Sequence, residues 1–464
     1  MLSEPVKREL TRIVAPENIS FQPEDLLCYS YDATGRRYLP ECVLFPHTAE
    51  EVSLILKMAN AEGIPVVPRG AGTGFTGGSL PLRGGIVLST ERMTTIEIDA
   101  DNMVGVAGAG TVTWDFAQKA ESVGLFYPPD PTSLKVSTIG GNIAECAGGP
   151  RGLKYGVTKD YVLAVEVVLP TGELIKTAPG KTFKGVVGYN LTGLITGSEG
   201  TLGVVTRAWL KLLPLPEEKR LLVATFDTLE RAGKTVIEII KAGGFLPSAL
   251  ELIDGVCLKA VDEYAKMGLG GVGAAIIVEV DGRREVVDID MEEARDICHR
   301  MGASSVDVAK DEKRMKELWS LRRAISPALK RVGSLKLNED VVVPRTEIVE
   351  LIRGVEGISR KRDVTIASFG HAGDGNIHVN IMVNKDDPEE VERGEASVGD
   401  LFELTLRLGG TISGEHGVGI TKSDYIGMEL NRDTLELMMR LKRAFDPNNI
   451  LNPGKIFKEE GVGV

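Results

Sequence analysis

Histidine and cysteine are both scarce in this chain of 464 residues, which contains five of each. The cysteines are scattered, and no Cys-x-x-Cys pair occurs in the sequence. Their spacing excludes the usual ligand patterns of an iron–sulfur cluster and of a structural zinc site. If the protein carries out redox chemistry, its electron relay must therefore lie elsewhere. The five residues are Cys28, Cys42, Cys146, Cys257 and Cys298.

Long apolar runs are absent as well, since no stretch approaches the roughly 18 residues of a membrane-spanning helix. The N-terminal segment MLSEPVKREL is charged and lacks an apolar signal core, which predicts a cytoplasmic location. Attachment to a membrane through another subunit stays open. The net charge of −12 argues against nucleic acid or an anionic membrane as the main partner.

Glycine is abundant, with 54 residues gathered in clusters. Such clusters mark places where the backbone turns sharply or approaches a ligand closely. They lie at 70–85, 105–110, 140–156, 185–203, 370–375 and 409–419.

The pattern of apolar residues changes near residue 215, after the proline-rich stretch LPLPEEKR. Before it, short β-branched runs follow a helix that Thr48 begins and Gly63 ends. After it, strands alternate with amphipathic helices at 229–242, 286–302 and 346–361. This mixture predicts an α+β domain with helices on one face of an antiparallel sheet.

The stretch PRGAGTGFTGGS, residues 68–79, carries five glycines after an apolar strand. Consecutive backbone N–H groups without side chains can converge on an anion. The stretch matches neither a Walker A loop nor the Rossmann spacing, because no Lys-Ser/Thr and no clear helix follow it. Taken alone, it is equally compatible with a phosphate site and with a surface loop. Two further small-residue stretches, 127–156 and 195–205, favour a ligand with a flat ring.

Three of the five histidines lie in two glycine-rich stretches, FGHAGDGNIHVN and TISGEHGVGITK. The Asp374-Gly375 turn can bring His371 and His378 onto facing strands of a hairpin. Two imidazoles and one carboxylate form a common open site for zinc, manganese or iron. Glu415 and His416 can supply a ligand and a base, whereas Asp374 is interpreted as a turn former.

A carboxylate substrate would need a cationic partner, and LWSLRRAIS offers one. Arg322 and Ser326 are four residues apart, and we expect them on a helix face away from Leu318, Leu321 and Ile325. Arg322 could bind a carboxylate through two N–H groups. A solvated charge on the helix surface is the competing interpretation.

The three glycine-rich stretches and the two histidine stretches, taken in order, resemble the FAD-linked 2-hydroxyacid dehydrogenases. This group of the vanillyl-alcohol oxidase superfamily includes the glycolate oxidase flavoprotein subunit, D-lactate dehydrogenases and D-2-hydroxyglutarate dehydrogenase. The resemblance covers residues 40–457. It implies a PCMH-type FAD-binding domain of two α+β subdomains at 1–215. An α+β substrate or cap domain at 216–420 would contain an antiparallel sheet and the metal site. A C-terminal helical segment at 421–464 would pack back on the FAD domain.

The resemblance also implies which residues contact FAD. The first loop would wrap the pyrophosphate, further residues would lie along the cofactor and beside the flavin, and a third group would lie near the adenosine half. Some relatives attach FAD covalently through a histidine in the first loop; this chain has none at 68–79, which predicts non-covalent FAD. The implied contacts are Pro68, Arg69, Gly70, Ala71, Gly72, Thr73, Gly74, Gly77, Gly78 and Ser79; Pro129, Asp130 and Ser133; Thr138, Gly141, Asn142, Ala147, Gly148, Gly152, Lys154 and Tyr155; Glu199, Gly200 and Val205; and Asn452.

In the histidine half, the same resemblance implies a divalent metal and a catalytic base. His371, His378 and Glu415 resemble the metal ligands, and His416 resembles the general base. A histidine, whose ordinary pKa is about 6.5, can accept a hydroxyl proton near neutral pH. The implied substrate contacts are Arg322, Ser326, Lys336 and Asn380, of which Lys336 resembles a substrate lysine of the hydroxyglutarate enzymes.

These observations predict a dehydrogenase that oxidises D-lactate, glycolate or a similar small 2-hydroxy acid to the 2-oxo acid. A D-2-hydroxyglutarate dehydrogenase is the alternative within the family. A metal-dependent hydrolase with a nucleotide-binding loop and a redox-silent electron-transfer or assembly subunit are alternatives from other classes. Because no cysteine follows Cys298, we expect a separate acceptor: an iron–sulfur subunit, an electron-transfer flavoprotein or a quinone-linked protein. A homodimer stays open.

Overall fold

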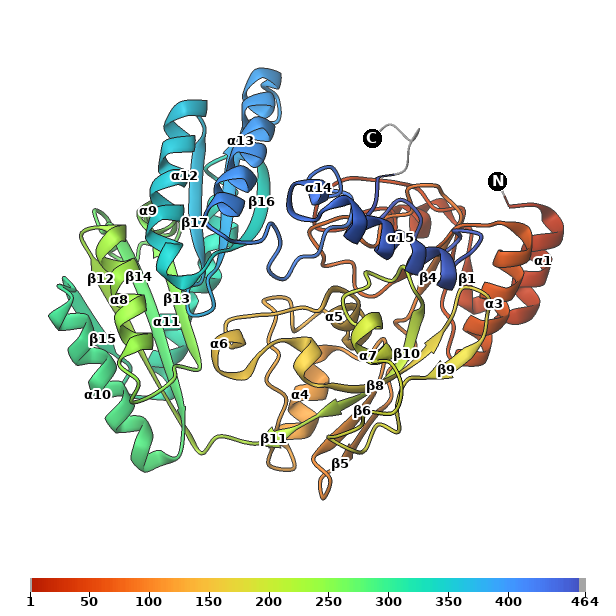
Figure 1. The fold of residues 1–464 in the computed structure, drawn as a ribbon, viewed down its shortest axis with the longest axis horizontal. Coiled ribbons are helices and arrows are strands. Elements are labelled where there is room, and N and C mark those ends of the chain that lie inside the picture. The colour runs from red at the N-terminus through yellow and green to blue at the C-terminus, as the bar shows by residue number, and fades with distance from the viewer. Residues whose placement is uncertain (1, 459–464) are drawn as a thin grey trace. The chain divides into compact units, whose positions relative to one another are not determined.

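The computed structural model describes residues 2–458, which form two compact units (Figure 1). Unit 1 consists of residues 2–148, 157–215 and 415–458, and unit 2 consists of residues 149–156 and 216–414. Met1 and the last six residues of the expected 421–464 segment lie outside the described residues. Among the described residues, no helix combines the length and the apolar character needed to cross a bilayer.

The first sheet of unit 1 has the strand order β1-β2-β4-β3, in which β4 pairs in parallel with both β2 and β3. The crossover from β2 to β3 is α3, whose N-terminus is capped by Thr48 and Glu51 and which ends at Gly63, as the sequence predicted. Its buried residues join the core beneath the sheet. The elements are α1 (Glu4–Ile13), β1 (Ile19–Ser20), α2 (Pro23–Cys28), β2 (Cys42–Leu44), α3 (Ala49–Glu62), β3 (Val66–Arg69) and β4 (Ile86–Ser89).

The second sheet of unit 1 is antiparallel, with the order β5-β6-β10-β8-β9. Helix α5 packs against β6 and β10. A two-stranded sheet pairs β7 with β11. The elements are β5 (Ile96–Asp99), β6 (Val104–Gly108), α4 (Thr113–Glu121), β7 (Leu125–Phe126), α5 (Ile139–Glu145), β8 (Val162–Val168), β9 (Leu174–Lys176), α7 (Leu191–Ile195), β10 (Val204–Lys211) and β11 (Leu213–Pro214).

The C-terminal segment belongs to unit 1. After α14 (Ile426–Glu429) and α15 (Arg432–Phe445), Leu451 forms a parallel bridge with Val66 of β3. The amide of Val66 donates to Ile450 O at 2.8 Å, and the amide of Asn452 donates to Val66 O at 2.8 Å. Residues 450–452 thus lie beside the strand that leads into the loop at 68–79.

Unit 2 is built on a seven-stranded sheet with the order β15-β12-β14-β13-β17-β18-β16. All its pairings are antiparallel, which confirms the predicted α+β class with an antiparallel sheet. The strands are β12 (Glu218–Phe226), β13 (Ala249–Asp254), β14 (Ala274–Gly282), β15 (Ser305–Val308), β16 (Leu335–Val342), β17 (Thr365–His371) and β18 (Asn376–Val383).

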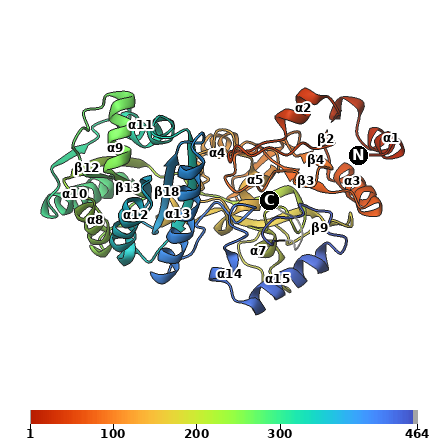
Figure 2. The same cartoon turned by 90° about the horizontal axis from the view of Figure 1, so that it is seen from above.

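Helices cover both faces of this sheet, so the prediction of helices on one face is wrong. Two helices, α9 and α11, pack on one face, and four others pack on the opposite face (Figure 2). The physical reason is that β13 and β18 are buried along their whole length, which leaves no face for water. The first pair is α9 (Gly255–Ala265) and α11 (Glu312–Leu329); the others are α8 (Leu229–Lys241), α10 (Arg284–Arg300), α12 (Ile348–Arg362) and α13 (Pro388–Arg407).

Candidate active site

The hairpin of β17 and β18 presents two histidines on one face of the unit 2 sheet. Its register pairs Phe369 with His378 and His371 with Asn376, so the two imidazoles project to the same side. Their ring centroids are 5.2 Å apart, and one ring nitrogen of each lies within 4.8 Å of the other's. Both side chains are buried, with 3% and 6% exposure. The predicted hairpin and the pairing of its histidines are confirmed.

The turn of this hairpin explains the Asp374-Gly375 pair. The amide of Asp374 donates to His371 O at 3.2 Å, and the amide of Asn376 donates to Asp374 Oδ1 at 3.3 Å. Asp374 therefore forms the local side-chain turn that its sequence context suggests.

A buried carboxylate, Glu251, orients His371. It lies on β13, where the pairing of Leu252 with Gly370 sets it beside His371, and its Oε1 contacts Nδ1 of that histidine. Burial raises the pKa of Glu251, but His371 and Arg322 outweigh burial and hold the pKa below its usual range. A carboxylate on one imidazole nitrogen fixes the ring and leaves the other nitrogen for a metal. Sequence reasoning missed Glu251, because nothing in the local pattern ALELID separates it from an ordinary strand residue.

Arg322 extends from α11 to the same carboxylate. Its Nε donates to Glu251 Oε2 at 2.5 Å, and its guanidinium lies 4.4 Å from the ring centroid of Phe369. Arg322 is buried together with Leu318 and Ile325, so the prediction that it faces away from these residues is wrong. The physical reason is the ionised Glu251 below the helix, which compensates the buried cation.

The other expected substrate residues lie on the same sheet face or in the helix above it. Lys336 on β16 donates to Ser326 Oγ of α11 at 3.4 Å, and burial lowers the pKa of Lys336. Asn380 is fully buried and donates through Nδ2 to Ala367 O at 3.2 Å and His378 O at 3.3 Å. Among the described residues, Asn380 Oδ1 has no hydrogen-bond partner.

The segment that leads to Glu415 is fixed beside the two histidines. Asp340 lies opposite His378 in the sheet, and its Oδ2 accepts the amide of Gly414 at 2.7 Å. A Cβ at position 414 would lie 2.3 Å from Nδ2 of Asn376, so Gly414 packs directly on the residue opposite His371. Glu415 follows by one peptide bond, with its Cα about 3.8 Å from that of Gly414.

In unit 1, the loop at 68–79 leaves β3 and forms no helix, as expected. Within the described part of the chain, the amides of residues 70–74 have no hydrogen-bond partner. The buried Arg69 links both ends of the loop and a neighbouring segment: it donates to Ser79 Oγ at 3.2 Å and to Tyr31 O at 2.8 Å. Adjacent N–H groups that no described residue engages are available to bind an anion.

The expected residues after this loop have mainly structural contacts. Thr138 caps α5 by accepting from the Gly141 amide at 3.2 Å, and Asn142 donates to Thr113 Oγ1 at 2.7 Å. Of the residues expected beside the flavin, Gly152, Lys154 and Tyr155 belong to unit 2, where both Lys154 Nζ at 2.6 Å and Tyr155 Oη at 2.9 Å contact Asp281. The other implied cofactor residues lie in unit 1: Ala71, Thr73, Gly74, Gly77, Gly78, Pro129, Asp130, Ser133, Ala147, Gly148, Gly200 and Val205.

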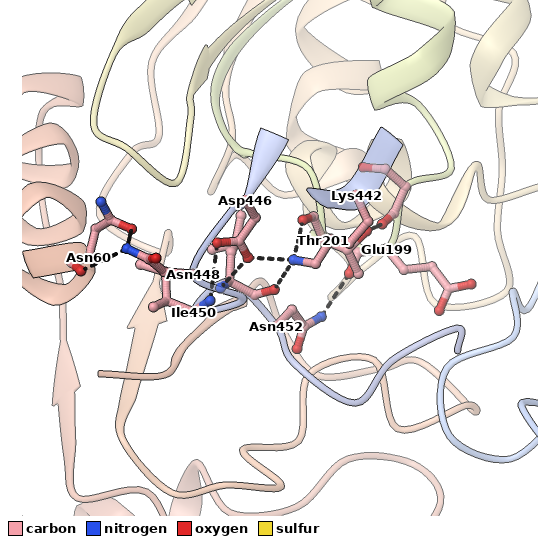
Figure 3. A network of polar contacts seen from close by, with 10 residues as sticks. Asn60, Glu199, Thr201, Lys442, Asp446, Asn448, Ile450 and Asn452 are labelled. Carbon is pink, nitrogen blue, oxygen red and sulfur yellow. Dashed lines mark hydrogen bonds and ion pairs between the residues drawn. The ribbon is translucent and has the colours of Figure 1, made fainter. Parts of the chain in front are cut away.

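Glu199 and Asn452 connect three segments of unit 1. Asn452 Nδ2 donates to Glu199 O at 2.7 Å and to Gly78 O at 2.8 Å, as Figure 3 shows for the first of these bonds. Lys442 completes the support by donating to Thr201 O at 2.9 Å and to Asp446 Oδ2 at 2.5 Å (Figure 3). Sequence reasoning missed Lys442 and Asp446, because a Lys and an Asp at the end of an amphipathic helix read as surface charges.

His416 of unit 1 contacts the loop at 68–79. Its carbonyl accepts from Thr76 Oγ1 at 3.1 Å, and its ring centroid is 5.1 Å from that of Phe75. The expected base is therefore attached to the loop that is expected to bind the cofactor.

Comparison with known proteins identifies the family. The profile of the C-terminal domain of FAD linked oxidases matches residues 215–456, and that of an FAD binding domain matches residues 40–178. The glycolate oxidase subunit GlcD of Bacillus subtilis is 44% identical over 99% of this chain and 98% of its own length. The chain belongs to the FAD-linked oxidases. It is an oxidoreductase and a flavoprotein, which excludes the hydrolase hypothesis.

Other FAD-linked oxidase relatives carry related names. A D-lactate dehydrogenase of Archaeoglobus fulgidus is 38% identical over 97% of this chain and 99% of its own length. Among solved structures, p-cresol methylhydroxylase has a TM-score of 0.82 at 18% identity, covering 98% of this chain and 97% of that one. Alkyldihydroxyacetonephosphate synthase has a TM-score of 0.76 at 19% identity, covering 98% and 86%. These likenesses confirm the predicted PCMH-type fold.

The residues of unit 1 fit an FAD pyrophosphate. The amides at 70–74 have no competing partner among the residues that the structure describes, and free donors are what binding a phosphate through the backbone requires. The loop at 68–79 of this FAD-linked oxidase is therefore suited to binding FAD, the cofactor in the family name.

Proposed function

We propose that this FAD-linked oxidase is a metal-dependent dehydrogenase that converts a small 2-hydroxy acid, D-lactate or glycolate, to the 2-oxo acid. The names of its relatives, glycolate oxidase and D-lactate dehydrogenase, support this substrate class. The observation that carries the proposal is the pair His371 and His378, oriented by the buried Glu251.

The metal would be held by His371, His378 and Glu415. The first two offer ring nitrogens on one face, and Glu415 follows Gly414, which Asp340 fixes beside them. This set of two imidazoles and one carboxylate suits zinc, manganese or iron. Such a metal would polarise the 2-hydroxyl group of the substrate and lower its pKa.

His416 would accept the hydroxyl proton, while the groups of unit 2 would orient the acid. Nε of Arg322 donates to Glu251, so the other four N–H groups of the guanidinium would be available to the substrate carboxylate. Asn380 Oδ1, buried and without a partner in the described residues, can accept from a substrate hydroxyl. Lys336 and Ser326 would contact the remainder of the substrate, and the lysine would favour a second carboxylate such as that of D-2-hydroxyglutarate.

FAD would be held non-covalently, since the loop at 68–79 contains no histidine. When bound, it supplies the acceptor for the hydride from C2 of the substrate. Its pyrophosphate would contact the amides at 70–74, and Glu199, Gly200, Val205 and Asn452 would lie near its adenosine half.

The electrons would then leave through a separate acceptor protein: an iron–sulfur subunit, an electron-transfer flavoprotein or a quinone-linked protein. The five scattered cysteines offer no cluster ligands for an internal relay. We propose a cytoplasmic protein that such a partner can bring to a membrane.

Metal removal tests the metal-dependent part of the proposal. We expect dialysis against a chelator to lower kcat for D-lactate and glycolate at least 100-fold with an artificial dye as acceptor, while the flavin absorbance stays unchanged. Zinc or manganese should restore the rate, because the imidazole pair stays in place. Full activity after verified removal of the metal would contradict the proposal, and comparison with D-2-hydroxyglutarate would decide the substrate class.

A further inference from the structure

The segment 414–420 is held by hydrogen bonds on both sides of the Glu415-His416 dipeptide. On the N-terminal side, the amide of Gly414 donates to Asp340 Oδ2 at 2.7 Å. On the C-terminal side, the amides of Val418 and Gly419 donate to the two carboxylate oxygens of Glu199, each at 2.7 Å.

Both carboxylates are buried, which makes their hydrogen bonds costly to lose. Asp340 is fully buried, and Glu199 is 5% exposed. Burial raises the pKa of Glu199, whereas the amides of Val418 and Gly419 act in the opposite direction. A buried carboxylate that accepts backbone amides holds the backbone rigidly, because neither partner can turn to water instead.

The loop at 68–79 adds a further constraint on the C-terminal side. Thr76 donates through Oγ1 to His416 O at 3.1 Å and accepts from the amide of Ile420 at 2.7 Å. Gly419 has φ +50°, and a Cβ there would lie 2.1 Å from Thr76 O. Only glycine allows the chain to approach both Thr76 and Glu199 at this point.

We propose that Asp340 and Glu199 are positioning residues for catalysis: they fix the Glu415-His416 dipeptide from its two ends, Asp340 through Gly414 and Glu199 through Val418 and Gly419. The inference rests on the proposed function, in which Glu415 binds the metal and His416 accepts the proton. Glu199 thereby acts on the backbone of the catalytic segment, beyond its expected place near FAD.

If Asp340 and Glu199 position the dipeptide, substitution of either residue should weaken metal binding and lower kcat. Glu199→Gln and Asp340→Asn each keep the side-chain shape but replace one accepting oxygen by an NH₂ group. In Glu199→Gln the NH₂ group would face an amide donor, so one of the two bonds to Val418 and Gly419 would be lost and Thr76 would carry more of the C-terminal attachment. Misplacement of a reacting group by about 1 Å can lower a rate about 100-fold.

Two matched controls separate positioning from general stability. Asp254 in unit 2 is buried and accepts the amides of Cys257 and Ser368. Glu51 in unit 1 is half-buried and accepts the amides of His47 and Thr48. Asp254→Asn and Glu51→Gln disturb the same kind of bond at a distance in sequence from the dipeptide.

The experiment measures three quantities for the four variants of the full-length, FAD-loaded protein. They are the Kd of zinc or manganese for metal-stripped protein by calorimetry, kcat per bound flavin, and hydrogen exchange of peptides that cover 411–422. We expect Glu199→Gln and Asp340→Asn to raise the metal Kd at least tenfold, to lower kcat 10- to 100-fold and to speed exchange at 414–420. The controls should change none of these.

The inference is overturned if Glu199→Gln and Asp340→Asn match the controls in metal Kd, kcat and hydrogen exchange. If the wild-type protein binds no metal and oxidises no 2-hydroxy acid, the proposed function fails instead. Hydrogen exchange at 414–420 would still decide whether the two carboxylates fix the segment, so the two failures are distinguishable.

Discussion

At the scale of single residues, Glu251 is the group on which the histidine pair depends most. It contacts His371 and Arg322 at once, and all three side chains are buried. The sequence could not predict this arrangement, because Glu251 and His371 are 120 residues apart and meet only through the pairing of β13 with β17. The same contact explains why Arg322 turns inward from its helix.

Glu251→Gln tests this role. The change keeps the size of the side chain but removes the charge that orients His371 and compensates Arg322. We expect the metal Kd to rise about 10- to 100-fold, and the free energy of unfolding to fall by about 3–5 kcal/mol. Calorimetric metal titration and urea unfolding measure the two effects.

Glu279→Gln is the matched control, since Glu279 is also buried in the sheet but accepts from Ser248 and Trp319. An unchanged metal Kd in Glu251→Gln, or an equal rise in the control, would contradict the orienting role.

Lys455 predicts a pH dependence of stability. Burial lowers the pKa of Lys455 to about 7, against the opposing attraction of Glu199 and other acids. The unfolded side chain has a pKa of about 10.4, so between these values the unfolded chain binds more protons and the free energy of unfolding rises with pH. Relative to Lys455→Met, the wild-type protein should gain roughly 2–3 kcal/mol between pH 6 and pH 9. Parallel stability curves in chemical denaturation would refute this.

At the scale of elements, the features that local sequence determines were predicted correctly. The capping residues of α3 and the Asp-Gly turn between β17 and β18 depend on a few adjacent residues. The arrangement of helices on both faces of the unit 2 sheet was not predicted, because each helix shows only that it is amphipathic, and which face it covers is decided by strand order. The roles of Asp340 and Glu199 were missed for the same reason, since their partners lie far away in the chain.

The hairpin turn offers an element-scale prediction. Gly375 has φ +89°, and a Cβ there would lie 2.2 Å from Val343 O. Gly375→Ala should therefore lower the free energy of unfolding by about 2–4 kcal/mol and weaken metal binding, because the two histidines flank the turn. Thermal unfolding and metal titration check both effects.

The control is Gly357→Ala in α12, where an added Cβ meets nothing within 4 Å. It should stabilise the protein by up to about 1 kcal/mol, because alanine favours a helix over glycine. If Gly375→Ala and Gly357→Ala change the free energy of unfolding and the metal affinity equally, the turn geometry determines neither quantity.

At the scale of the whole molecule, each of the two units contains a different set of candidate functional residues. Unit 1 contains the loop at 68–79 and the segment with His416, and unit 2 contains the histidine pair with Glu251. The peptide bond between Gly414 and Glu415 joins the two sets in sequence. The order of motifs predicted the family from sequence, whereas the buried carboxylates that support each set could be found only in the structure.

The most direct test of the central claim is an absorbance spectrum of the purified protein, before and after anaerobic addition of D-lactate or glycolate. We predict bands of oxidised flavin that bleach within seconds with one of these acids, and that do not bleach after the metal has been removed. Flavin bands that no 2-hydroxy acid bleaches, even with zinc or manganese added, would contradict the proposed reaction and leave only the FAD-binding fold.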